Sequence, residues 1–153
     1  MGAGVWGSVF FALFALMIII SRPLVGKVYA RYGSRFVIYP GVGLFIVGLA
    51  ILGVVSTPVG IICTAPLLGL GYGAAQPAFQ ALAVQSAPIE RAGVSTATYF
   101  LALDIAVGAG SVILALIANA LGYQSLYQIT SLIMIIALAL YHFVIRKHSY
   151  IGE

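Results

Sequence analysis

Residues 36–55 read FVIYPGVGLFIVGLAILGVV, an apolar stretch without a charged side chain. As a helix rising about 1.5 Å per residue, this stretch is long enough to cross a hydrocarbon core of about 30 Å. Further apolar runs of similar length occupy residues 3–21, 59–80, 93–118 and 125–145. None of them shows the alternating polarity of a barrel strand. The sequence therefore predicts an all-α integral membrane protein, with five transmembrane helices in a single domain over residues 1–153.

The composition excludes several classes of protein. Hydrophobic residues make up 63% of the chain and charged residues 7%, which leaves too little polar surface to coat a water-soluble globule. The net charge of +4 comes from bases that flank the apolar runs, so it does not indicate nucleic acid binding. Cys63 is the only cysteine, which excludes an internal disulfide and a cysteine metal cluster. We expect no metal and no cofactor, and we expect the first run to be a retained helix rather than a cleaved signal peptide.

The basic residues all fall in alternate connections between the apolar runs. They are Arg22, Lys27, Arg31, Arg35, Arg91, Arg146 and Lys147. The remaining connections, residues 56–58 and 121–124, carry no charge. Because basic connections tend to stay on the cytoplasmic side, we expect a multi-pass protein of the cell membrane with its amino end outside and its carboxyl end in the cytoplasm.

Proline residues mark expected joints in the chain. Pro23 and Pro40 are expected to bracket the first basic loop as boundary residues. Pro66 and Pro77 lie inside the third apolar run, where each removes a backbone donor from a helix without nearby water. Two outcomes are open for this run: a kinked helix, or a helix that ends near Pro77 and continues as an interfacial turn.

Polar residues are concentrated in the third and fourth runs. Tyr72, Gln76 and Gln80 recur every four residues and so share one helical face. This stripe either holds neighbouring helices together or lines a path for a solute. The second and fifth runs are almost purely apolar through their middles, so we expect them to face lipid while the third and fourth face a cavity.

Asp104 is the only ionisable residue deep in any apolar run. It lies about eleven residues, or roughly 16 Å, from the start of the fourth run, close to the bilayer midplane. A charge there costs about 2.5–3.5 kcal/mol on insertion scales, so the carboxyl is protonated, hydrogen-bonded or hydrated. It serves either proton coupling or a structural contact with the Gln76 and Gln80 face. A lone acid without a hydrolase or metalloprotease motif does not predict an enzyme.

The first basic loop carries a recognisable spacing of glycines and bases. Gly26, four residues, Arg31, one residue, Gly33 and then Arg35 resembles the loop motif of the major facilitator superfamily, with Ala30 where that motif has an acid. The resemblance implies that these four residues form a cytoplasmic gating loop. Physically, the glycines permit a tight turn and the bases hold it at the headgroups.

Later segments are similar to helices ten and eleven of superfamily members related to multidrug efflux pumps. The segments are Gly69-x-Gly71-x-Gly73-x-x-x-Pro77-x-x-Gln80, Pro88-x-x-Arg91-Ala92-Gly93 and Asp104-Ile105-Ala106-Val107-Gly108-x-Gly110. The resemblance implies that the five spans are helices eight to twelve, a partial fold from the second six-helix half, with helices nine and twelve peripheral.

The resemblance implies secondary transport of small organic compounds, by proton-coupled efflux, in partnership with an amino-terminal half that this chain lacks. Asp104, Tyr72, Gln76 and Gln80 are then expected to line the substrate or proton pathway. The alternative is a non-transporting helical membrane subunit or an inert fragment that packs against a partner, in which Asp104 serves assembly. Co-expression with a matching first half distinguishes the two.

Overall fold

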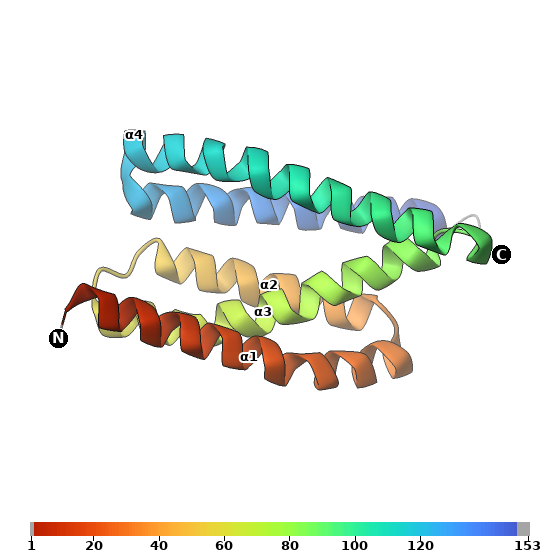
Figure 1. Cartoon of the computed structure of the whole chain (residues 1–153), viewed down its shortest axis with the longest axis horizontal. Coiled ribbons are helices and arrows are strands. Elements are labelled where there is room, and N and C mark those ends of the chain that lie inside the picture. Colours follow the sequence, from red (N-terminus) through yellow and green to blue (C-terminus); the bar gives the residue numbers. More distant parts are fainter. Residues whose placement is uncertain (1, 150–153) are drawn as a thin grey trace.

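The structure, a computed structural model, describes residues 2–149, and all regular secondary structure within that range is helical. The helices are α1 (Ala3–Tyr32), α2 (Arg35–Leu52), α3 (Pro58–Gln85) and α4 (Ala92–Ser149), with one 3₁₀ turn, η1 (Ile89–Arg91), before α4. Each of the four helices is long and apolar enough to cross a membrane. Figure 1 shows them running back and forth along one long axis. The predicted all-α membrane fold is confirmed.

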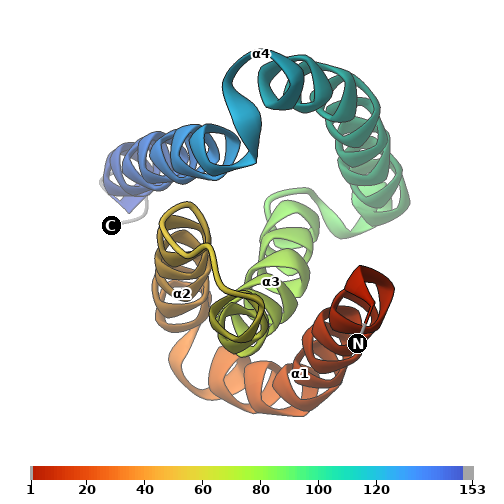
Figure 2. The same ribbon diagram turned by 90° about the vertical axis from the view of Figure 1, so that its left-hand side faces the viewer.

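Helix α4 contains two spans rather than one. Gly122 leaves helical geometry with φ 82° and ψ 164°, a conformation that only glycine adopts readily. The chain reverses there, so residues 92–121 and residues 123–149 run in opposite directions (Figure 1) and diverge from the turn (Figure 2). The predicted uncharged connection over residues 121–124 is thereby reduced to a single non-helical residue. The described part of the chain therefore has five long helical segments.

The connections alternate between the two ends of the bundle (Figure 1). The turns after α1 and after α3 lie at the same end, which we call the basic end, because Arg31 ends α1, Arg35 begins α2 and Arg91 ends η1 there. The α2–α3 connection and the reversal at Gly122 lie at the opposite, uncharged end. The fold therefore places the basic connections at one end of the bundle and the uncharged connections at the other, as the alternation in the sequence predicts. The side chains of Arg146 and Lys147 lie outside the described part.

Helix α1 is longer than the apolar run that predicts it, and the expected first loop is almost absent. Pro23 lies inside α1 and Pro40 inside α2, so their assignment as boundary residues is wrong. Only Gly33 and Ser34 separate the two helices. Proline is tolerated within such helices because neighbouring groups satisfy the freed carbonyl, so it is a weak stop signal in membranes.

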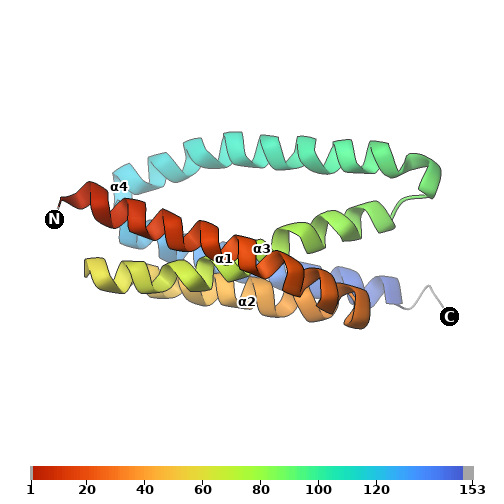
Figure 3. The same cartoon turned by 60° about the horizontal axis from the view of Figure 1, so that its bottom comes forward.

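Helix α3 continues through Pro66 and Pro77 to Gln85, so the interpretation in which it ends near Pro77 is wrong. It begins at Pro58, where Thr57 accepts a hydrogen bond from the Gly60 backbone N–H at 3.3 Å. The helix changes direction along its length (Figure 3). This bend follows from two prolines, each of which clashes with the preceding turn.

Helices α2 and α3 form the tightest contact in the bundle. A Cβ placed on Gly71 would lie 2.6 Å from the backbone nitrogen of Phe45 and 2.7 Å from the carbonyl oxygen of Gly41. Ile38 of α2 is completely buried. The prediction that the second span simply faces lipid therefore needs correction. A span without polar residues gives no sign of which apolar side is packed on protein, whereas its glycines mark the close contact.

The second segment of α4 packs along α2 through hydrogen bonds. Gln124 donates to the Ser56 hydroxyl at 2.9 Å, and Gln128 donates to the Gly53 carbonyl at 3.3 Å. Near the basic end, the Tyr39 hydroxyl and His142 Nδ1 lie 2.7 Å apart. These contacts hold the fifth span against the second. Helix α3 contacts α1, α2 and α4.

Candidate functional site

The polar stripe of α3 lines two adjoining cavities. Gln76 and Gln80 line a cavity of about 560 Å³ in the half of the bundle toward the basic end, which we call the polar cavity. Its walls come from α1, α3 and the first segment of α4. Its lining residues are Arg22, Val25, Gly26, Tyr29, Ala30, Gln76, Pro77, Ala78, Gln80, Ala81 and Phe100. The stripe therefore lies on an open face of the protein rather than in a sealed helix contact.

A smaller cavity of about 250 Å³ continues from Gln76 to Tyr72, with Tyr99 and Leu103 of α4 on its other side. The Tyr99 hydroxyl donates a hydrogen bond to the Gln76 backbone carbonyl at 3.2 Å. That carbonyl belongs to the residue before Pro77, so the bond joins α4 to α3 next to the proline. Tyr99 thus fixes the distance between α4 and the stripe.

Tyr72 stands between two aromatic rings. Its ring centroid lies 6.1 Å from that of Phe14 in α1 and 6.3 Å from that of Phe45 in α2. These separations are typical of packed aromatic pairs. Tyr72 is therefore the point of the stripe at which α1, α2 and α3 meet.

The structure does not bring Asp104 to the stripe. Asp104 is exposed, lines neither cavity and has no hydrogen bond or ion pair with another described residue. The reason is helical geometry. Tyr99 and Leu103, four residues apart, face α3, and Asp104 follows about 100° further round the helix. The proposed structural contact between Asp104 and the Gln76 and Gln80 face is absent from the described part of the chain.

The residues of the loop motif have separate positions. Gly26 is helical and lines the polar cavity, with no atom within 4 Å of a Cβ placed on it. Arg31 ends α1, with its guanidinium 5.5 Å from the centre of the Tyr32 ring. Gly33 makes the turn with φ 85°, and its N–H donates to the Tyr29 carbonyl at 3.0 Å. Arg35 begins α2. The expected tight turn therefore depends on Gly33, while Gly26 keeps a helix face open.

Two polar residues of the cavity on α1, Arg22 and Tyr29, are not predicted as site residues from the sequence. Arg22, Gly26 and Tyr29 follow one another at spacings of four and three residues, so they share one face of α1. They share it because α1 continues as a helix to Tyr32, beyond the apolar run at residues 3–21. The Tyr29 hydroxyl also donates to Gln85 Oε1 at 3.0 Å, which joins α1 to the end of α3.

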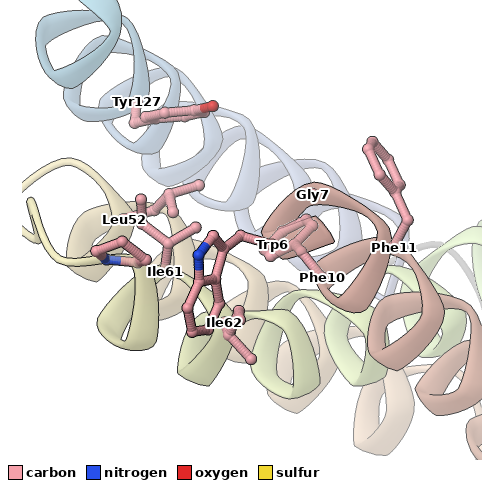
Figure 4. A pocket seen from close by; sticks show the side chains of 9 residues that line it. Trp6, Gly7, Phe10, Phe11, Leu52, Ile61, Ile62 and Tyr127 are labelled. Carbon is pink, nitrogen blue, oxygen red and sulfur yellow. The ribbon is translucent and has the colours of Figure 1, made fainter. Parts of the chain in front are cut away.

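A separate apolar pocket of about 390 Å³ lies toward the uncharged end of the bundle. Trp6 reaches from α1 toward Ile61 and Ile62 of α3, and Tyr127 lies on the facing helix (Figure 4). None of the predicted site residues lines this pocket. Among the described residues, no group of three His, Cys, Asp or Glu side chains is placed to hold a metal ion.

Comparison with known families identifies the fold. The family model of the Major Facilitator Superfamily matches residues 2–151, almost the full chain. No significant match occurs among curated proteins or among solved structures. This family comprises transporters of small molecules across lipid bilayers, in agreement with apolar helices around a polar cavity. The chain belongs to the Major Facilitator Superfamily.

Proposed function

We propose that this chain supplies helices eight to twelve of a secondary transporter of small organic compounds, with α1, α3 and residues 92–121 facing the transport pathway. The polar cavity is the observation that carries this proposal, because it places Gln76 and Gln80 of α3 opposite α1 and Phe100. Transport sites of such proteins lie between two helical halves that rock about them. The basic end then faces the cytoplasm of the cell membrane.

The distribution of glycines supports a partner on the cavity side. Gly4 and Gly7 of α1, and Gly108 and Gly110 of α4, have no atom within 4 Å of an added Cβ. Gly41 and Gly71, by contrast, are packed against the opposite backbone. Small residues in membrane helices permit close helix approach, so open glycines suit further helices. We assign this role to the amino-terminal half of the transporter.

Efflux driven by protons completes the proposal. The direction comes from the resemblance to multidrug efflux members, and Asp104 is the candidate proton carrier within this chain. A carboxyl near the bilayer centre without a partner in the described part is costly unless it is protonated or hydrated. Reversible protonation at such a position is the property that proton coupling requires.

The test is co-expression with the amino-terminal half of a related transporter in cells loaded with a fluorescent dye. We expect dye efflux that stops when an uncoupler collapses the proton gradient. Asp104→Asn should abolish it at equal protein level, while Glu90→Gln, which changes an acid in the turn before α4 and not one in the middle of a span, should leave it unchanged. Absence of efflux with an assembled complex would favour the alternative, a non-transporting helical subunit or inert fragment.

A further inference from the structure

The polar cavity contains a cation without a matching acid. Arg22 is the only charged residue among the lining residues. Glu90 and Asp104, the two acids in the described part of the chain, do not line this cavity, and Arg22 has no ion pair or hydrogen bond with any described residue. The cavity therefore carries net positive charge from the groups that the structure describes.

Packing between helices sets the depth of Arg22 along the bundle, where its exposed side chain lines the polar cavity. Gly73 of α3 packs against Ile18 and Ser21 of α1, so Arg22, which follows Ser21, begins near the level of Gly73. At this level Gly41 of α2 packs against Ala74 of α3. Gly41 follows the start of α2 by six residues, or about 9 Å along the helix. The backbone of Arg22 therefore lies deeper in the bundle than the turns of the basic end. From there its long side chain can extend along the cavity.

The surrounding groups define the chemistry of an occupant. A guanidinium offers five N–H donors in a planar fork that matches a carboxylate or phosphate. Gln76 and Gln80 provide amides that both donate and accept, and Phe100 and Pro77 provide apolar surface. A volume of about 560 Å³ is within the range of small-molecule sites. We infer that the polar cavity takes a small organic anion, whose acidic group pairs with Arg22 and whose apolar body lies against Phe100. This inference rests on the proposed transport function and specifies its substrate class.

Binding to the full chain in phosphatidylcholine nanodiscs tests the inference without requiring transport. The probes are radiolabelled 2-naphthoate and its neutral analogue 2-naphthamide, which differ in charge and little in shape. We expect naphthoate to bind at least about tenfold more tightly, as one charge-assisted hydrogen bond predicts. Arg22→Gln should remove this preference, and Arg22→Lys should retain part of it. Arg91→Gln, which changes an arginine outside the cavity, should retain all of it.

Several results would overturn the inference. One is equal binding of both probes by the unaltered chain, a comparison that holds even if Arg22→Gln fails to fold. Another is a preference that survives in folded Arg22→Gln. A third is displacement of naphthoate by soluble short-chain phosphatidylglycerol at constant ionic strength, without displacement by the matching phosphatidylcholine, which would assign Arg22 to an anionic lipid. Failure of dye efflux with the naphthoate preference intact would instead count against the proposed transport function alone.

Discussion

Replacing Gly71 by alanine tests whether close contact between α2 and α3 holds the bundle together. The new Cβ would lie 2.6 Å from the Phe45 backbone nitrogen, whereas ordinary contact begins at 3.4 Å, so the helices must separate by about 0.8 Å. Both obstructing atoms, Phe45 N and Gly41 O, belong to the backbone and cannot rotate away. Overpacking of this kind costs about 1–3 kcal/mol, and the helix preference of alanine returns up to about 1 kcal/mol. We expect a net loss of about 1–2 kcal/mol.

The measurement is reversible unfolding of the purified chain by sodium dodecyl sulfate in dodecyl maltoside micelles, followed by circular dichroism. Gly43→Ala is the matched control, because Gly43 lies in α2 and no atom is within 4 Å of its added Cβ. That variant should be neutral or more stable by up to about 1 kcal/mol. If Gly71→Ala unfolds at the same detergent fraction as Gly43→Ala, the reasoning about backbone contact is refuted.

Three further predictions concern the turns and the topology. Gly122→Ala should destabilise the chain by about 1–3 kcal/mol in the same titration, because φ 82° and ψ 164° suit only glycine, and an unchanged midpoint would contradict the role of this reversal. Tyr39→Phe should lower the free energy of unfolding by about 0.5–1.5 kcal/mol, because it removes the contact with His142. The double variant Tyr39→Phe/His142→Phe should lose little more than Tyr39→Phe alone, and strictly additive losses would show that the two side chains are not coupled. In a cysteine-free background, a cysteine at Ser56 should react with an impermeant maleimide on intact cells and one at Ser34 only after permeabilisation, and the reverse pattern would invert the proposed orientation.

The number and order of the spans could be predicted from the sequence because run length and charge placement are direct consequences of bilayer thickness and topology. The ends of the helices could not, since Pro23 and Pro40 act as stops in water but are accommodated within α1 and α2. The sequence also indicated a polar stripe on α3, and the structure places Gln76 and Gln80 in a cavity.

The position of Asp104 relative to that stripe was beyond the sequence. Depth along a helix follows from counting residues, but the rotation of one helix against another depends on which side chains pack, here Tyr99 and Leu103. The role of Arg22 was also beyond the sequence. Its charge follows from topology, whereas its shared face with Gly26 and Tyr29 depends on α1 continuing as a helix beyond the apolar run at residues 3–21.

The reversal at Gly122 also bears on biosynthesis. Because only one residue interrupts the helix, the segment carrying Asp104 is followed at once during translation by a second helical segment whose middle, residues 132–140, has only apolar side chains. We expect the two to leave the protein-conducting channel together as a closed hairpin, so that the costly carboxyl enters lipid beside a strongly hydrophobic companion rather than alone. A flexible polar linker inserted at this turn would let the two helices enter the membrane separately. We would then expect the helix that carries Asp104 to insert less efficiently.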